Sequence, residues 1–577
     1  MSFPKSTIKV ISLSALAILS LILIFTNLDG DISILRRHGD YGDEGYWIQN
    51  AFNKVKHGVF LTDDQAQGYF GAPLFTFLLT AFSKTFGATL YSARLFSMII
   101  ALFSACLLWV TLKKILKNNF TASLLVVLFL SLPETKLYGA WCSPITLEWL
   151  FSIAFIYWVL NHPLTNFKNI TIAAVLILLN VLSKSTSIYL IGVFAFQIFF
   201  DLRIIKQKGK LTTAISSVIV ACVLLFVGYN IIQTVLKLQY PVEYAQFKQL
   251  IKWNMNFKQG IIDMFSQALN PFFWMQNIIG LLKFTSGILI MIVFIWSFKT
   301  SLVKINYKLS VIKSSSFWVE NRNSAVFGMV FFTYWIFLLL IGQTGFDRRI
   351  AAQLPILFVG LGIAINNIGN SWFTSNRWKL IGVVIALFVF GNQAIDMFNS
   401  GTVFYFPLLG FMTVAAAGLF LFIRFGNPSV AIFYIIAVNC VSTFVFQSKS
   451  HTLSTISENL SDIKTKYNVK YMVGFNVHQL ASNNNIIPIW YQKKLVNWNS
   501  NFPLFDRNNA TIVVSSLNHP DKLKMSETLF TMKDLPASVI VLDSMDITSQ
   551  KMLMFDPIIK KTKLQNEQLR FYVVRGK

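Results

Sequence analysis

The sequence predicts an all-α polytopic membrane protein with about thirteen transmembrane helices, followed by a small C-terminal α/β domain. Three observations predict this fold class. Hydrophobic residues make up 54% of the 577 residues and charged residues only 13%, whereas soluble domains carry roughly 25% charged residues. Apolar runs near the length of about 20 residues that a hydrocarbon core requires recur between residues 8 and 446. After residue 446 the pattern changes to polar stretches and short strand-like runs.

Each apolar run is predicted to form a helix, because a chain in lipid must satisfy its backbone hydrogen bonds internally. The predicted spans are residues 8–28, 89–112, 119–134, 143–160, 168–184, 186–200, 211–232, 276–298, 324–341, 350–368, 379–397, 403–423 and 429–446. The first span follows a short basic head, as in a secretory signal, but the stretch FTNLDGD offers no small-residue cleavage site. We therefore expect this span to be retained as an anchor.

Lysine and arginine predict which loops face the cytoplasm, since short cytoplasmic loops carry the excess of these residues. With the N-terminus inside, the inner loops hold eighteen basic residues and two acidic residues, Asp201 and Glu320. These loops account for +16 of the net charge of +25, so the basic balance is a topology signal and no nucleic-acid partner is expected. The predicted location is the cell (inner) membrane, with residues 29–88, residues 233–275 and the tail from 447 outside the cytoplasm.

Residues 447–577 are predicted to form an extracytoplasmic α/β domain that follows a membrane domain of residues 1–446. The strand-like runs VKYMVGFN, ATIVVSS, SVIVLDS and RFYVVRG alternate with polar helix-like stretches. Elsewhere the four cysteines show no paired spacing, and the histidines of the tail lack the spacing of metal ligands. The sequence therefore predicts neither a disulfide framework nor a metal centre.

Ionisable residues gather at the extracytoplasmic ends of the predicted spans. Such residues are costly beside hydrocarbon and mark a pathway or a site, unless they reach out to the headgroups. They are Arg94, Glu148, Lys184, Lys283, Arg348 and Arg349. The acidic stretch RRHGDYGDEGYW, residues 36–47, lies on the same predicted side. A cationic ring below an acidic loop suits a lipid-linked sugar phosphate, because the cations would bind the phosphate and a carboxylate would take the proton of an acceptor hydroxyl.

Several stretches resemble the GT-C glycosyltransferases of the protein O-mannosyltransferase and lipid A aminoarabinose transferase type. The stretch DEGYWIQNAFNKVKHGVFLTDDQAQGYFGAPLFTFLLTAFSKTFG, residues 43–87, is similar to the first outer loop of that family, which begins with an Asp-Glu pair. The stretch SARLFSM resembles the start of the family's next membrane helix. NVLSKSTSIYL is similar to a helix junction that reads LTKGP in the family. FDRRIAAQLP resembles the start of a late family helix, with an arginine and a proline at matching positions. Thirteen helices and an outer C-terminal domain are also the layout of the aminoarabinose transferases.

The resemblance implies roles for individual residues. Asp43 would be the catalytic carboxylate that activates the acceptor, with Glu44 beside it and Asp40 as the alternative base. The donor phosphate would be bound by Lys184, Arg348, Arg349 and Arg94. A second interpretation stays open for Asp43, because Asp is a favoured helix N-cap and a helix is predicted from about residue 44.

The chain departs from the family pattern at two places that concern cofactors and charge. Where several relatives read E-K-P-P, this chain reads Phe70, Gly71, Ala72 and Pro73, so the glutamate that relatives use toward a metal is missing. A divalent metal, which the resemblance alone implies, therefore lacks this ligand, and no cofactor is predicted. In the fourth span relatives carry an arginine and an aspartate, whereas this chain offers only Glu148.

The sequence thus predicts a hexosyl- or pentosyltransferase that moves a sugar from a polyprenyl-phosphate donor to an envelope acceptor outside the cytoplasm. The acceptor class, whether glycolipid, polysaccharide or protein, is left open. Two other classes also remain open: a transporter or flippase of lipid-linked sugars, and an inactive structural member of a polysaccharide assembly. The Asp-Glu loop favours the enzyme over both, while the missing family residues keep the inactive member in consideration.

Overall fold

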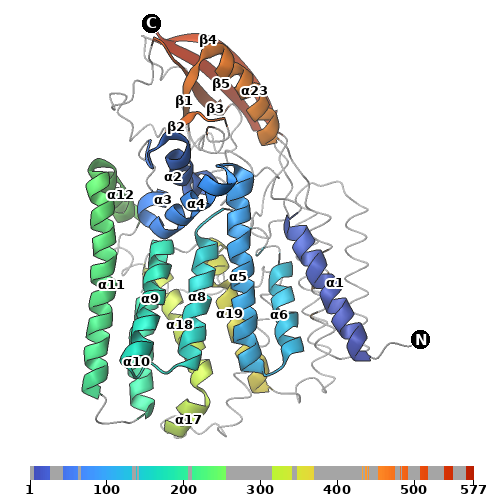
Figure 1. Cartoon of the computed structure of the whole chain (residues 1–577), viewed down its shortest axis with the longest axis vertical. Helices are drawn as coiled ribbons and strands as arrows, with labels where there is room; N and C mark the ends of the chain where they lie inside the picture. Colours follow the sequence, from blue (N-terminus) through green and yellow to red (C-terminus); the bar gives the residue numbers. More distant parts are fainter. Residues whose placement is uncertain are drawn as a thin grey trace.

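The structure is a computed structural model of the chain, shown in Figure 1. It describes residues 5–25, 43–62, 67–132, 135, 138–139, 142–205, 211–254, 315–340, 347–368, 432, 436–437, 440, 452–474, 481, 484–490, 507–516, 539–549 and 567–577. A helical bundle forms one end of the molecule, a layer of short helices lies above it, and a small β-sheet covers that layer (Figure 1).

Nine long helices of the described residues coincide with predicted spans. They are α1 (Lys5–Phe25), α5 (Leu90–Leu116), α6 (Asn119–Ser131), α8 (Ile145–Asn161), α9 (Phe167–Ser183), α10 (Tyr189–Ile205), α11 (Leu211–Gln239), α18 (Arg322–Leu340) and α19 (Asp347–Ile368). A short helix, α17 (Ser315–Glu320), precedes α18. The predicted spans 276–298, 379–397, 403–423 and most of 429–446 lie outside the described residues.

Helix limits follow local capping chemistry as well as hydrophobicity. Thr89 and Ser92 form a capping box that starts α5, in which each side chain accepts a hydrogen bond from the other residue's backbone N–H. The helix ends at Lys117, whose φ of 53° is left-handed, and the Asn118 side chain then caps α6. These caps place the turn between two helices at residues 117–118.

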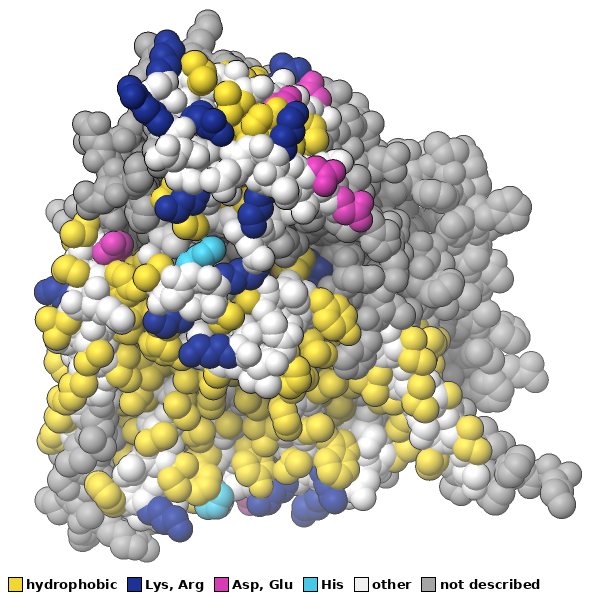
Figure 2. Space-filling view, turned by 45° about the horizontal axis from the view of Figure 1, so that its top comes forward, with side chains coloured by type: hydrophobic (Ala, Val, Ile, Leu, Met, Phe, Trp, Pro, Cys, Tyr) yellow, Lys and Arg dark blue, Asp and Glu magenta, His cyan; other side chains and the backbone are white. Residues whose placement is uncertain are grey.

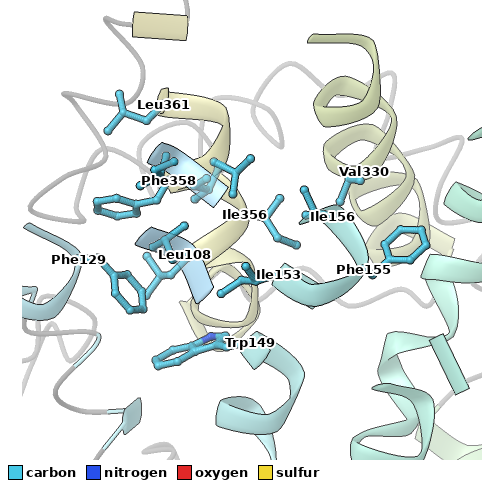
Figure 3. Packing of buried hydrophobic residues seen from close by; sticks show 14 of the residues in the cluster. Leu108, Phe129, Trp149, Ile153, Phe155, Ile156, Val330, Ile356, Phe358 and Leu361 are labelled. Atoms are coloured by element: carbon cyan, nitrogen blue, oxygen red, sulfur yellow. The ribbon is translucent and has the colours of Figure 1, made fainter. Parts of the chain in front are cut away.

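The bundle core is built from large side chains of α5, α6, α8, α18 and α19, as Figure 3 shows. The Phe129 ring packs edge-on against Trp149 and Phe358, with ring centroids 5.6 and 5.5 Å apart. Close packing between α18 and α19 depends on Gly360, because a Cβ there would lie 2.3 Å from the Phe327 ring. Helices far apart in sequence therefore share one packed interior.

The outer surface of the bundle is strongly apolar. Phe103, Phe199 and Phe226 are 60%, 64% and 72% exposed, and Figure 2 shows hydrophobic side chains in a broad belt across this part of the molecule. Among the described helices, α5 alone is both long and apolar enough to cross a membrane by length and composition. Exposed apolar surface of this extent is typical of proteins that contact lipid.

At the end of the bundle away from the sheet, an ion pair joins three helices. The Asp201 carboxylate on α10 accepts hydrogen bonds from Arg322 Nε on α18 at 2.9 Å and from the backbone N–H of Leu164 at 2.8 Å. Arg322 also donates to the backbone oxygen of Val159 on α8 at 2.8 Å. Asp201 is 1% exposed, so this pair is an internal clamp between α8, α10 and α18.

Above the bundle lie four short helices: α2 (Asp43–His57), α3 (Gln67–Gly71), α4 (Pro73–Phe86) and α12 (Pro241–Asn254). The apolar side of α2 packs on α4 and on the first turns of α5 through Phe52, Phe75 and Phe96. Aromatic residues of α3 pack on the α11–α12 corner, where the Tyr69 hydroxyl donates to Gln239 Oε1 at 2.6 Å. Of the predicted outer region 233–275, residues 255–275 lie outside the described residues, and α12 forms its single separate helix within the described part.

The C-terminal region contains helix α23 (Thr452–Tyr467) and a five-stranded sheet of order β2-β1-β3-β5-β4. The strands are β1 (Val469–Gly474), β2 (Ile487–Trp490), β3 (Ala510–Ser516), β4 (Val539–Ser549) and β5 (Glu567–Gly576). β1 pairs in parallel with β2 and β3, while β5 runs antiparallel to β3 and β4. Four strands coincide with the predicted runs, and β2 is an additional strand.

The sheet domain contacts the helices below it at two points. Leu90, the first residue of α5, packs both on the apolar core of the domain and on the core of α2 and α4. Burial lowers the pKa of Lys56 on α2 to about 8, and the charge of Lys464 on α23 adds to this effect. The same causes lower the pKa of His57. Positive charges of α2 and α23 therefore repel each other across a partly buried contact.

We expect the stability of the protein to rise between pH 8 and pH 10.5 through Lys56. Over this range the unfolded chain still binds the Lys56 proton that the folded protein has lost, since the pKa falls from 10.5 to about 8 on folding. Lys56→Met should raise the melting temperature in detergent at pH 7 and flatten this part of the pH profile. Lys84→Met, at an exposed position of α4, is the control. A Lys56→Met profile parallel to that of the unaltered protein would contradict the prediction.

Candidate functional site

The predicted acidic loop leads into helix α2, which begins at Asp43 itself. This is one residue before the predicted start, so the backbone of Asp43 already belongs to the first helical turn. An acidic residue there is favourable because the helix dipole is positive at its N-terminus. Asp40, the alternative base, lies outside the described residues.

Glu44 is fixed by a bidentate ion pair with Arg94. Its Oε1 accepts hydrogen bonds from Arg94 Nε at 2.9 Å and from the backbone N–H of Cys142 at 3.0 Å, while its Oε2 accepts from Arg94 Nη2 at 2.8 Å. The two side chains are 0% and 1% exposed. This pairing ties the start of α2 to α5 and to the segment before α8. Glu44 was predicted to lie beside the catalytic carboxylate and Arg94 to bind phosphate, and the structure makes them partners of each other.

Another polar side chain of α2 binds the segment that follows this helix in the sequence. Asn50 Nδ2 donates to the backbone oxygen of Phe60 at 3.3 Å, and Asn50 Oδ1 accepts from the backbone N–H of Tyr69 at 3.1 Å. Gly68 is required at this point, because a Cβ there would lie 2.7 Å from Asn50 Oδ1. Buried amides thus give α2 a defined position above the bundle.

Lys184 lies at the end of α9 and is paired with a glutamate. Its Nζ donates to Glu148 Oε2 on α8 at 3.1 Å, and the Ser187 hydroxyl donates to Glu148 Oε1 at 3.0 Å. Ser187 belongs to the 3₁₀ turn η1 (Ser185–Ile188) that directly follows Lys184. Glu148 is 1% exposed and Lys184 is 19% exposed. The ammonium group therefore lies at the accessible side of a buried carboxylate.

A second polar contact connects this position to α19. Gln353 Nε2 on α19 donates to the Tyr189 hydroxyl at the start of α10 at 2.7 Å, and both residues are buried. The predicted phosphate ligands Arg348 and Arg349 lie in the first turn of α19, and Arg349 is one turn before Gln353 on the same helix face. The Gln353–Tyr189 contact therefore joins the second turn of α19 to the start of α10, five residues after Lys184 in the sequence.

Residues 142–148, which lead into the first turn of α8, join the two clusters. Cys142, which binds Glu44, and Glu148, which binds Lys184, are six residues apart, and between them α8 begins at Ile145. The start of α2 and the end of α9 are thereby held to the same short segment. A proton acceptor and a phosphate-binding cation on either side of it could act on one substrate.

The residues of this region do not fit the divalent metal that the family resemblance implies. At the position of the family glutamate, Phe70 and Ala72 are buried apolar residues, and the Phe70 backbone oxygen accepts a hydrogen bond from Gln233 at 3.1 Å. Within the described parts of the chain, no three His, Cys, Asp or Glu side chains come together.

Sequence reasoning missed most of the polar residues around the Lys184–Glu148 pair. Glu148 stood out as a charge within a predicted span, but Ser187, Tyr189 and Gln353 did not. The spacing of Ser187 and Tyr189 directly after Lys184 is a signal that could have identified two of them. Gln353 carries no such signal, because it meets Tyr189 across 164 residues.

Comparison with solved structures identifies the fold. ArnT from Cupriavidus metallidurans in the apo state aligns with a TM-score of 0.58 at 13% identity, over 98% of both chains. ArnT bound to undecaprenyl phosphate aligns with a TM-score of 0.56 at 13% identity, over 97% of both chains. The chain has the fold of ArnT. The predicted resemblance to lipid A aminoarabinose transferase is confirmed at this level.

A weaker likeness is to the Archaeoglobus fulgidus oligosaccharyltransferase, with a TM-score of 0.42 at 12% identity over 89% of this chain and 69% of that chain. No protein-family model matches the chain, and no characterised protein matches it in sequence. The likeness to ArnT therefore lies in the arrangement of the helices and the C-terminal sheet rather than in sequence.

We expect Arg94→Met to destabilise the protein severely. The substitution leaves the Glu44 carboxylate buried without its counter-charge, which costs about 3 to 5 kcal/mol in comparable pairs. The double variant Glu44→Gln with Arg94→Met should recover part of the loss, because neither charge is then buried. Melting temperature in detergent measures both effects. Equal melting temperatures for the single variant and the unaltered protein would show that the pair contributes nothing.

Proposed function

We propose that this protein is a membrane glycosyltransferase that transfers a sugar from a polyprenyl-phosphate donor to an acceptor outside the cytoplasm. The observation that carries the proposal is the segment of residues 142–148, whose Cys142 backbone N–H donates to Glu44 and whose Glu148 carboxylate binds Lys184. We infer that Asp43, next to Glu44, acts together with the lysine that would hold the donor phosphate. A transporter or flippase would require no proton acceptor at this place.

In the proposed reaction, Asp43 removes the proton from an acceptor hydroxyl as its oxygen attacks the anomeric carbon. The bond between that carbon and the phosphate oxygen breaks, and the polyprenyl phosphate leaves with one additional negative charge. Attack from the side opposite the phosphate inverts the anomeric configuration. Lys184, Arg348 and Arg349 stabilise the leaving phosphate electrostatically.

Glu44 and Arg94 support this reaction by positioning Asp43. Because both are almost fully buried, we assign them the task of fixing the first turn of α2, where Asp43 lies. Phosphate binding is assigned to Lys184 instead, since its side chain is 19% exposed. In this proposal Arg94 affects the reaction indirectly, because it binds Glu44 and Glu44 fixes the helical turn that carries Asp43.

The proposed topology places about thirteen helices of residues 1–446 in the membrane, with the N-terminus in the cytoplasm. The outer loop 29–88 and the α/β domain of residues 447–577 lie outside. Three features support this arrangement: the apolar belt of the bundle, the position of α2 and the sheet at one end, and the basic residues at the end of α5 opposite to them (Figure 1). The likeness to ArnT over 97% of both chains also supports a lipid-phosphate donor.

The test of the proposal is the comparison of Asp43→Asn with Asp43→Ala. Asp43 lies within the first turn of α2, where a negative charge contributes about 0.3 to 1 kcal/mol, so Asp43→Asn and Asp43→Ala should both cost no more than about 1 kcal/mol and should both fold. Both should lower sugar transfer by roughly 100-fold to 10,000-fold, because neither residue accepts a proton at neutral pH. Mass spectrometry of envelope glycans and glycolipids from cells with each variant measures transfer. Asp462→Asn, at an exposed position of α23, is the matched control.

Two outcomes would contradict the proposal in different ways. Normal transfer by Asp43→Asn would remove Asp43 as the base and direct attention to Asp40. If the envelope glycans do not change when the whole protein is absent, the glycosyltransferase function is excluded. A transporter or an inactive assembly member is then favoured.

A separate prediction concerns the phosphate. Lys184→Ala and the double variant Arg348→Ala with Arg349→Ala should each raise the donor concentration needed for half-maximal transfer at least about tenfold. The reason is the loss of a cation beside a partly desolvated anion. Lys248→Ala, an exposed lysine of α12 that stacks near Tyr244, should leave donor use unchanged. An unchanged donor dependence in both site variants would exclude these residues from phosphate binding.

A further inference from the structure

Glu148 is a buried carboxylate with a defined set of partners. It lies in the first turn of α8, is 1% exposed, and accepts hydrogen bonds from Lys184 Nζ at 3.1 Å and from the Ser187 hydroxyl at 3.0 Å. A carboxylate at such a position is costly unless it is paired, and it often marks a functional site. Its partners come from the end of α9 and the following turn, so Glu148 holds the segment that carries Lys184.

Lys184 has capacity for a second anion. Among the residues that the structure describes, its ammonium group has one hydrogen-bond partner, Glu148, whereas an ammonium group can donate three hydrogen bonds. The Lys184 side chain is 19% exposed and that of Glu148 is 1% exposed, so the lysine is the more accessible member of the pair. The backbone is fixed as well, because the Lys184 N–H donates to the Asn180 oxygen at 2.9 Å and its own carbonyl accepts from Ser187 at 3.0 Å.

A lysine side chain alone would be a poor component of a phosphate site in a membrane protein. It has four flexible methylene groups and tends to extend toward the headgroups. The Glu148 carboxylate prevents this by binding the ammonium group at a fixed point beside α8. Tyr189, two residues after Ser187, accepts a hydrogen bond from Gln353 and so joins the start of α10 to α19.

We propose that Glu148 is the positioning residue of the donor-phosphate site. It orients the Lys184 ammonium group toward the phosphate and, through Ser187, fixes the turn from which Lys184 projects. This inference rests on the proposed function, because it requires that a lipid phosphate binds at Lys184. Glu148 itself does not contact the reacting atoms.

The experiment measures binding of undecaprenyl monophosphate to the full-length protein in detergent, so that neither the sugar nor the acceptor needs to be known. Glu148→Gln should weaken this binding at least tenfold while the melting temperature falls only slightly. Glu148→Asp, which keeps the charge but withdraws it by one methylene group, should show an intermediate loss. It also serves as the second variant if Glu148→Gln does not fold.

The matched control is Asp201→Asn, which breaks the ion pair with Arg322 at the opposite end of the bundle. This change should lower the melting temperature and leave the affinity for undecaprenyl monophosphate unchanged. The exchange Glu148→Lys with Lys184→Glu adds a second control. It restores an ion pair, so it should recover stability relative to either single change, but it should not recover lipid binding.

The outcomes separate the inference from the function on which it rests. An unaltered protein that does not bind undecaprenyl monophosphate overturns the proposed function. Binding by the unaltered protein and by Glu148→Gln within twofold of each other overturns only the positioning role. Equal losses in Glu148→Gln and Asp201→Asn would also overturn it, because they would show a general effect of stability.

Discussion

The ion pair between Glu44 and Arg94 is the interaction on which the outer part of this molecule depends. Two parallel hydrogen bonds of 2.8 and 2.9 Å join a loop helix to a helix of the bundle across 50 residues of sequence. A third bond, from the Cys142 backbone, joins them to the segment that precedes α8. With both side chains shielded from solvent, removal of either charge would leave the other buried and uncompensated. The position of Asp43 is therefore a consequence of its neighbour's contacts.

The helices could be predicted from the sequence because each one is a continuous stretch of mostly apolar residues, which is a local property of the sequence. The predicted span 119–134 and the observed α6, Asn119–Ser131, differ only at the end. The strand β2 escaped prediction, since Ile487–Trp490 has only four residues and includes Pro488. Its place beside β1 is fixed by pairing within the sheet rather than by its own composition.

The site was harder to predict, because a cation at the outer end of a span has the same sequence signature whatever its partner. Arg94 and Lys184 were predicted to share one task, yet their carboxylate partners lie 50 and 36 residues away in sequence. Their exposure separates them, at 1% for Arg94 and 19% for Lys184. Only the folded structure distinguishes a buried cation with a structural role from an accessible cation that can bind a ligand.

Leu90 connects the C-terminal domain to the helices that carry the candidate site. It packs into the core of the sheet domain and into the core of α2 and α4, and it lies one helical turn before Arg94. A chain cut before α23 would expose an apolar patch beside the most deeply buried charge of the outer layer. Through this one side chain, the core of the sheet domain adjoins the helix whose Arg94 binds Glu44, so the domain and the first turns of α5 share a packed surface.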